Sequence, residues 1–337
     1  MTTATIKRAE LDSISLSRLL EGNVDAVNEL VSACKINGFF YLDFRGVATS
    51  ETLKQVDELI DIGNSVFELP LEEKEEYSTE KYLPSRLQGY KRAGCSVGPF
   101  AKKKDGYESF SIHNNGLWGD DSLQLPQGFH ENLPLVKAFV GQVHEYTECI
   151  LSILSNALEL PYDLKDCHRK DKPSSANMAL LKYLPWSSDA EKVGNMAHTD
   201  MGTLTVVFTK AEGLQALLPG PSGKDEWSYI PPRPGHAIVN VGDSLRFLSK
   251  GALASSLHRV VPPPLPYSPG QHKFSCIYFL RPEFDAKFTD HAGRQISSVE
   301  WHNQKYSLFR EASLDPNEHG DMLTGRKGYL GATSQTV

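Results

Sequence analysis

Two stretches of the chain decide its fold: residues 195–214, which read NMAHTDMGTLTVVFTKAEGL, and residues 255–260, which read SSLHRV. Within the first stretch, His198 and Asp200 are two positions apart, so on an extended segment their side chains leave the same face of a sheet. His258, in the second stretch, can add a third ligand from another strand. Two imidazoles and one carboxylate suit Fe(II) and leave further coordination positions open. The sequence therefore predicts a catalytic iron site at His198, Asp200 and His258.

A His-x-Asp pair is by itself a weak signal, and the chain contains a second copy at residues 319–321. That copy lies in a glycine-containing tail without a strand pattern or a later histidine, so we expect a solvated loop there. The pair at 198–200 instead opens a β-rich run, and His258 follows an expected turn. The alternative for these three residues is a set of hydrogen-bonded polar side chains inside a β-barrel.

Composition limits the classes of protein to be considered. The 337 residues are 40% hydrophobic and 23% charged, which supports a large packed core. The net charge is −7 and no basic run exceeds residues 102–104, so neither nucleic acid nor a membrane surface is expected as a partner. We expect no secretion signal or membrane span, because no stretch approaches the ~18 apolar residues of a span. Five scattered cysteines without a C-x-x-C pair indicate reduced thiols and a cytoplasmic location.

The first half of the chain alternates helical and strand patterns. Apolar residues follow helical spacing from position 27 to 34, and Gly38 ends this helix before a buried strand at 39–42. Two more helices and one more strand are expected at 53–67, 135–160 and 107–112. We assign residues 1–170 to an N-terminal region of helices and mixed structure that packs on a barrel.

Beyond residues 171–175, which resemble a linker, the pattern changes to short β-rich runs bounded by Gly and Pro. These runs lie at 178–183, 203–208, 214–218, 237–241, 258–261 and 274–280. Short strands at such spacing indicate a sandwich or jelly roll. A helix is expected at 297–309, and a polar tail at 313–337. The sequence thus predicts an α+β fold with a jelly-roll core at 171–312, flanking N-terminal helices and a C-terminal helix.

Several motifs occur in the order found in a known superfamily: HTD at 198–200, GLQ at 213–215, PGHAIVNVGD at 234–243 and SLHRV at 256–260. They resemble those of the 2-oxoglutarate- and Fe(II)-dependent dioxygenases, in particular the branch that contains isopenicillin N synthase. The N-terminal half agrees through NGFFY at 37–41, LPLEEK at 69–74, GY at 89–90 and ESF at 108–110. The resemblance covers residues 10–312 and implies a distorted double-stranded β-helix, with the metal at one mouth and the N-terminal helices outside.

The resemblance also implies a site for 2-oxoglutarate. Members of the superfamily bind its distal carboxylate with an Arg-x-Ser pair, and the matching residues here are Lys273 and Ser275. A lysine pairs with a carboxylate as a point charge rather than as a planar fork. Tyr183 matches an early-strand tyrosine that assists. Alternatively, Lys273 is a solvated lysine at a strand end and Tyr183 a core residue, and Arg281 is then the fallback partner for the anion.

The reaction implied by the resemblance is that of an oxidoreductase, a dioxygenase that uses Fe(II), 2-oxoglutarate and O₂. It would hydroxylate or desaturate a C–H bond of a small, mostly apolar molecule in secondary metabolite biosynthesis, releasing succinate and CO₂. By the family's layout, six residues are candidates to line the substrate pocket: Phe110, Leu181, Asn195, Leu204, Phe247 and Phe279. Each could equally be an ordinary core residue.

Two alternatives remain open from the sequence. One is an oxidase of the isopenicillin N synthase type, which uses the same iron triad without 2-oxoglutarate; the lysine at position 273 keeps it open. The other is a catalytically silent jelly-roll binding module, which the complete triad argues against. Succinate release separates the first alternative from a dioxygenase, and Fe(II) binding tests the second. The lysine and the proline-rich loop at 262–270 resemble microbial, including fungal, enzymes more than the plant branch. The sequence carries no indication of the oligomeric state.

Overall fold

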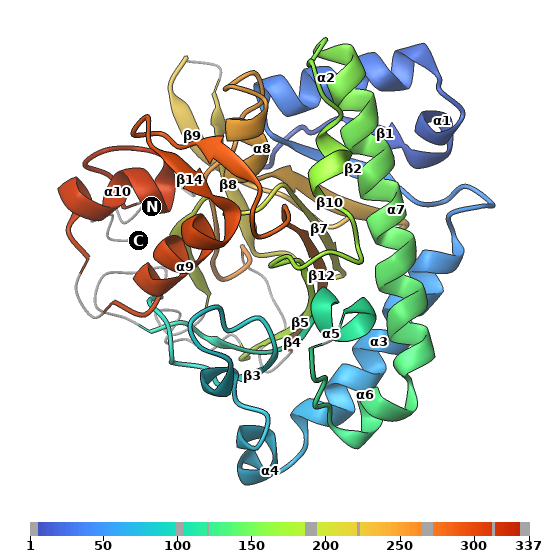
Figure 1. The fold of residues 1–337 in the computed structure, drawn as a ribbon, viewed down its shortest axis with the longest axis vertical. Helices are drawn as coiled ribbons and strands as arrows, with labels where there is room; N and C mark the ends of the chain where they lie inside the picture. Colours follow the sequence, from blue (N-terminus) through green and yellow to red (C-terminus); the bar gives the residue numbers. More distant parts are fainter. Residues whose placement is uncertain are drawn as a thin grey trace.

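Two facing β-sheets and a layer of helices make up the fold (Figure 1). The computed structural model describes residues 6–98, 104–119, 121–185, 194–220, 223–264, 272–311 and 314–330. The larger sheet has eight strands, in the order β1 (Ser13–Ser15), β2 (Phe39–Asp43), β10 (His236–Val241), β7 (Leu204–Thr209), β12 (Lys273–Leu280), β5 (Asn177–Tyr183), β4 (Tyr107–His113) and β3 (Gly89–Lys91). Its neighbouring strands are antiparallel except for β1 and β2.

The smaller sheet has four strands, in the order β6 (Asn195–His198), β11 (His258–Val260), β8 (Leu214–Pro219) and β9 (Asp225–Tyr229). A two-stranded ribbon of β13 (Lys287–Thr289) and β14 (Gln295–Ser297) follows β12 in the chain. Residues of the eight-stranded sheet and of the four-stranded sheet line one cavity, so these two sheets enclose it between them. This arrangement confirms the predicted α+β fold with a jelly-roll core.

Helices cover the outer face of the larger sheet (Figure 1). The longest are α7 (Leu133–Ala157), α3 (Glu51–Phe67) and α2 (Val24–Ile36). In α3 the buried residues Val56, Leu59 and Val66 recur at helical spacing, so one stripe of the helix faces the sheet. The remaining helices are α1 (Leu16–Leu20), α4 (Leu71–Glu75), α5 (Asn114–Trp118), α6 (Gln127–Glu131), α8 (Asp243–Leu248), α9 (Ser298–Leu308), α10 (Pro316–Thr324) and the 3₁₀ turns η1 (Thr79–Tyr82) and η2 (Leu164–Cys167).

A glycine makes the sharp junction between α2 and β2. Gly38 has φ +61°, a left-handed conformation that ends helices readily only at glycine. A Cβ at this position would lie 2.0 Å from the carbonyl oxygen of Ala254. The backbone of the segment before β11 therefore passes close to the start of β2, and the expected helix stop at Gly38 is confirmed.

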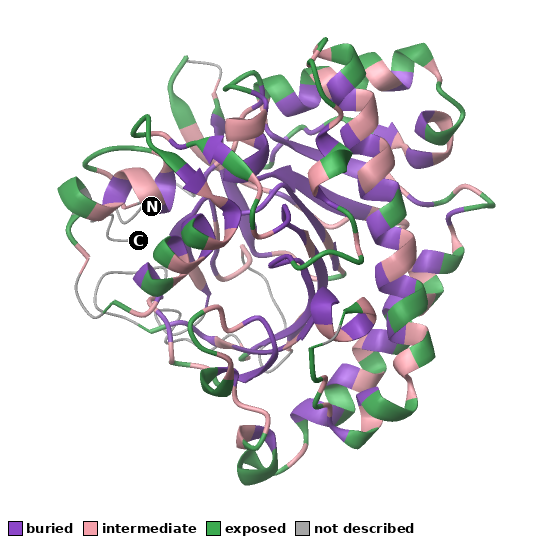
Figure 2. Cartoon of the chain, viewed as in Figure 1, coloured by how far each residue is buried: buried purple, intermediate pink, exposed green. Residues whose placement is uncertain are grey.

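The strands of the larger sheet divide their side chains between the helices and the cavity. In β7, Leu204, Val206 and Phe208 belong to the core packed under the helices, whereas Thr205 and Val207 line the cavity. The same alternation holds in β12, β5 and β4. Figure 2 shows these strands as buried and the outer faces of the helices as exposed. One face of the sheet therefore supplies stability and the other supplies the site.

The structure confirms the expected helices and strands and adds several elements. Residues 319–321 lie in α10, so the expectation of a solvated loop was wrong; Leu323 of this helix is fully buried, and its carbonyl accepts a hydrogen bond from Thr199 N–H at 2.9 Å. Strands from the regions 1–170 and 171–312 share one sheet, and the boundaries at 170 and 312 stay predictions. All five cysteines are free. Among the described helices, none has the length and apolar character required to cross a membrane.

Candidate active site

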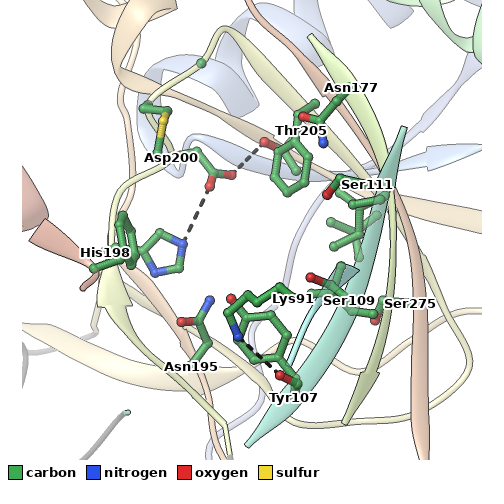
Figure 3. Close-up of a pocket in the computed structure, with 18 of the residues that line it drawn as sticks. Lys91, Tyr107, Ser109, Ser111, Asn177, Asn195, His198, Asp200, Thr205 and Ser275 are labelled. Atoms are coloured by element: carbon green, nitrogen blue, oxygen red, sulfur yellow. Dashed lines mark hydrogen bonds and ion pairs between the residues drawn. The ribbon is translucent and has the colours of Figure 1, made fainter. Parts of the chain in front are cut away.

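Three side chains from the smaller sheet converge at one point. His198 ends β6, Asp200 follows it, and His258 begins β11 directly opposite His198 in the strand pairing. Asp200 Oδ1 lies 3.6 Å from His198 Nε2 and 3.8 Å from His258 Nε2. All three residues are buried, and their candidate ligand atoms lie within 4.8 Å of one another. Figure 3 shows His198 and Asp200 facing the same cavity. The structure thus brings together the three residues that the sequence predicted.

The second polar atom of each side chain already has a partner. His198 Nδ1 lies 2.8 Å from the carbonyl oxygen of Met196, and His258 Nδ1 lies 3.2 Å from that of Ser256. Because a carbonyl can only accept, each ring donates its Nδ1 proton to it, and the neutral form of each ring then has its Nε2 lone pair for a metal.

The carboxylate is oriented in the same manner. Asp200 Oδ2 accepts hydrogen bonds from Thr205 Oγ1 at 2.6 Å and from Asn240 Nδ2 at 2.7 Å. Its other oxygen, Oδ1, is therefore left toward the two imidazoles. Two nitrogens and one oxygen on one side of a common point fit Fe(II) with open coordination positions.

The protonation states also suit a metal. Burial disfavours the charged carboxylate of Asp200, but its interactions with the neighbouring imidazoles and the hydrogen bond from Asn240 hold its pKa below the ordinary value. Burial, together with the nearby His198, lowers the pKa of His258 to about 4. At neutral pH the site therefore offers an anionic carboxylate and a neutral imidazole at His258, the forms that coordinate metal ions.

A buried ion pair holds the turn that carries Asp200. Lys305 of α9 donates to Thr199 Oγ1 at 2.7 Å and to the carboxylate of Asp243. The backbone N–H of Asp243 donates to the carbonyl oxygen of Asp200 at 2.7 Å. Sequence reasoning missed Lys305, because nothing in its local pattern connects α9 with the distant metal-binding turn.

The opposite wall of the cavity carries the residues expected to bind 2-oxoglutarate. Lys273 is 2% exposed, which excludes the alternative of a solvated lysine at a strand end. Its ammonium group donates to Thr209 Oγ1 at 2.9 Å and to the carbonyl oxygen of Ala211 at 2.7 Å. Burial lowers its pKa to about 7, and none of the described carboxylates pairs with it. The buried Ser275 lines the same cavity, and the Tyr183 ring lies 5.8 Å from Lys273 Nζ.

Three of the six residues expected in the substrate pocket line the cavity: Leu181, Asn195 and Phe279. Phe110, Leu204 and Phe247 do not, and for these the expectation was wrong. Phe110 packs against Phe129 in the core under the helices, and Leu204 belongs to the same core. Phe247 lies in α8, where its ring is 5.1 Å from that of Trp301. Strand alternation explains the first two, because β4 and β7 turn the neighbouring positions to the cavity.

The cavity has a volume of about 170 Å³, and several polar side chains line it beside the apolar ones. Ser109 and Ser111 of β4 project into it, as does Asn177 of β5 (Figure 3). Arg281 also lines it. The two serines could have been found by counting alternate positions from Phe110, whereas Arg281 follows the end of β12, where alternation alone does not settle its direction.

Comparisons with known proteins agree with this geometry. Residues 175–282 match the family model of the 2OG-Fe(II) oxygenase superfamily, and residues 11–130 match the model "non-haem dioxygenase in morphine synthesis N-terminal". The 2-oxoglutarate-dependent dioxygenase gloE of Glarea lozoyensis is 36% identical over 325 residues, which cover 95% of this chain and 94% of that protein. The 2-oxoglutarate-dependent dioxygenase frbH of a Dothideomycetidae species is 34% identical over 322 residues, covering 95% and 96%.

A solved structure shows the same fold. It is that of a full-length Neurospora crassa protein in complex with alpha-KG, with a TM-score of 0.70, 20% identity, and coverage of 88% of this chain and 96% of that one. A further structure of that protein contains alpha-KG and thymine. Taken with the sequence relatives, these findings show that the chain belongs to the 2OG-Fe(II) oxygenase superfamily and is a 2-oxoglutarate-dependent dioxygenase that requires Fe(II), 2-oxoglutarate and O₂.

Proposed function

We propose that His198, Asp200 and His258 hold the iron of this dioxygenase, and that Lys273, Ser275 and Tyr183 bind 2-oxoglutarate. The enzyme then hydroxylates or desaturates a C–H bond of a small molecule of secondary metabolism. The observation that carries this proposal is the meeting of three ligand atoms within 4.8 Å, each on a side chain whose other polar atom is already engaged. Such outer partners orient ligands and raise metal affinity.

His198, Asp200 and His258 line the cavity, so the open coordination positions of a bound iron would face it. When bound, the iron supplies the oxidative chemistry together with O₂ and 2-oxoglutarate. The protein's task is to position the reactants and to keep water out. The apolar side chains of Leu181, Val207, Ile277 and Phe279 line the cavity and support the exclusion of water.

Lys273 is suited to one end of a dicarboxylate. An ammonium group has three donors, and two of them are used by Thr209 and Ala211. The third is left for a ligand, and a buried cation without a counter-charge is stabilised by an arriving anion. Ser275 lies two positions along the same strand face and adds a hydroxyl donor. Tyr183, opposite Lys273 in the strand pairing, lines the cavity beside it.

Two further proposals concern the setting of the reaction. The net charge of −7 supports a small-molecule substrate rather than nucleic acid. Five free cysteines support a reducing compartment such as the cytoplasm.

The test is turnover with purified enzyme, Fe(II), ascorbate and 2-oxoglutarate. Succinate should form slowly without substrate, and His258→Ala should abolish it. An exposed control, His130→Ala on the outer helix α6, should leave the rate unchanged. O₂ consumption without succinate would instead indicate an oxidase of the isopenicillin N synthase type, and failure to bind Fe(II) would support a silent binding module.

A further inference from the structure

The cavity contains a second buried cation, Arg281, which follows the end of β12 away from Lys273. It is 9% exposed, and it forms part of the cavity wall. Its Nη1 group donates to the carbonyl oxygen of Ser175 at 2.5 Å and to Asn177 Oδ1. These two bonds use both hydrogens of Nη1 and hold the guanidinium in place.

The other edge of this guanidinium makes no hydrogen bond within the described part of the chain. Among the residues that the structure describes, nothing accepts a hydrogen bond from Nε or Nη2 of Arg281, and no carboxylate forms an ion pair with it. Nε and Nη2 form the fork that binds a carboxylate through two parallel hydrogen bonds. The chain contains an example, since Arg169 binds Glu283 through Nε and Nη2 at 2.7 and 2.6 Å. Arg281 offers the same pair of donors, and no described residue accepts a hydrogen bond from them.

Arg281 is a buried charge without a dedicated counter-charge among the described residues. Burial lowers the pKa of Arg281 to about 10, so the guanidinium remains protonated at neutral pH. The acidic residue that acts on it is Asp200, whose carboxylate is committed to Thr205, Asn240 and the proposed metal. A buried charge without a counter-charge is costly, and an anionic ligand offsets that cost.

Neighbouring residues favour this placement of the side chain. A Cβ at position 202 would lie 2.7 Å from Arg281 Cγ, so Gly202 leaves the room that the arginine needs. The guanidinium carbon lies 4.8 Å from the centre of the Phe279 ring, a distance at which a cation is attracted to the ring face.

The two cations of the cavity lie at opposite ends of one strand face. Lys273, Ser275, Ile277, Phe279 and Arg281 all line the cavity. Eight positions of extended chain separate the Cα atoms of the two cations by roughly 26 Å, at about 3.3 Å per residue. This backbone separation exceeds the length of a five-carbon dicarboxylate held at Lys273. We therefore expect that one co-substrate leaves the Nε and Nη2 donors of Arg281 available.

We propose that Arg281 binds a carboxylate group of the primary substrate through Nε and Nη2. The substrate class is then small carboxylic acids, including amino acids, rather than neutral apolar molecules. This inference rests on the proposed function, in that the same cavity holds 2-oxoglutarate at Lys273.

The test compares carboxylic acids with their primary amides in the enzyme loaded anaerobically with Fe(II) and 2-oxoglutarate. The probes are matched pairs, namely butyrate and butyramide, phenylacetate and phenylacetamide, and leucine and leucinamide, and binding is measured as the shift in thermal unfolding. For at least one pair, the acid should bind ten times or more tightly than its amide. Arg281→Gln should remove that preference, and Arg281→Lys should restore part of it. Arg45→Gln is the control for loss of one exposed guanidinium, and it should keep the preference.

The outcomes separate the inference from the function on which it rests. Equal binding of acid and amide, or no binding by any acid, would overturn the assignment. If Arg281→Gln raises the requirement for 2-oxoglutarate tenfold and leaves the acid preference intact, the carboxylate at Arg281 belongs to the co-substrate and the assignment is wrong. Failure of the wild type to bind Fe(II) and 2-oxoglutarate would instead refute the proposed function, and the acid preference would still be readable from the thermal shift.

Discussion

Lys305 and Asp243 form a fully buried ion pair, with side-chain exposures of 0% and 4%, beside the turn that carries Asp200. Lys305 also donates to Thr199, the residue between the expected metal ligands His198 and Asp200. Helix α9, far along the chain, therefore helps to set the geometry of the candidate metal site. An uncompensated charge at this place would be costly, because both groups are removed from water.

Replacing Lys305 with Met should destabilise the folded protein. The change leaves Asp243 buried without its partner, so the free energy of unfolding should fall by about 3–5 kcal/mol, as measured by urea denaturation. The double variant Lys305→Met/Asp243→Leu removes both charges and should recover part of the loss. Wild-type stability in the single variant would mean that the ion pair does not support the turn.

Asn240 should control how tightly the metal is held. Asn240→Ala removes one of the two hydrogen bonds to Asp200 Oδ2, so the carboxylate is less well oriented. Affinity for Fe(II), measured by anaerobic titration, should fall roughly 10- to 100-fold. The control is Asn23→Ala, which alters a helix cap far from the cavity. An unchanged affinity in Asn240→Ala would show that Thr205 alone suffices to orient Asp200.

Substitution of Lys273 should separate binding of 2-oxoglutarate from binding of iron. In Lys273→Met the distal carboxylate loses its partner, so the half-saturating 2-oxoglutarate concentration should rise about 100-fold or more while Fe(II) affinity stays within about twofold. Lys273→Arg should be far less affected, since it restores a cation. An equal requirement for 2-oxoglutarate in the wild type and Lys273→Met would place the anchor elsewhere.

The buried ammonium of Lys273 should also leave a signature in the pH dependence of stability. Its pKa is lowered by burial to about 7 in the folded protein, against an ordinary value of 10.5. Between these values the unfolded chain binds the extra proton, so this group makes the ligand-free protein more stable as pH rises from about 7 toward 10.5, by about 1.4 kcal/mol per pH unit. The difference in unfolding free energy between wild type and Lys273→Met should therefore change over this range. Parallel curves would contradict a buried, unpaired lysine.

The sequence predicted the elements of this fold because their apolar periodicity is strong. Helices α2, α3 and α7 and the strands of the jelly roll occur close to their expected positions. The triad could be predicted because His198 and Asp200 stand two positions apart beside a β-rich run and the motif around His258 is distinctive. The face of a strand that meets the cavity was harder to predict, because it depends on pairing with distant strands. For this reason Phe110 was expected in the cavity, whereas its neighbours Ser109 and Ser111 line it.

Other features are properties of tertiary contacts alone. The ion pair of Lys305 joins residues distant in sequence, and no local pattern marks it. Residues 319–321 resemble a polar tail by composition, but the burial of Leu323 against the region of Thr199 stabilises a helix there. The free edge of Arg281 is visible only once Ser175 and Asn177 are placed beside it.

His198, Asp200 and His258 are proposed to hold one Fe(II) beside a bound 2-oxoglutarate. The most direct measurement is the visible absorption spectrum on anaerobic addition of Fe(II) and then 2-oxoglutarate to the purified enzyme. A weak metal-to-ligand charge-transfer band should appear in the wild type and be absent from His198→Ala and His258→Ala, with all three proteins folded by circular dichroism. A band that persists in either variant, or that fails to appear in the wild type with iron bound, would contradict it.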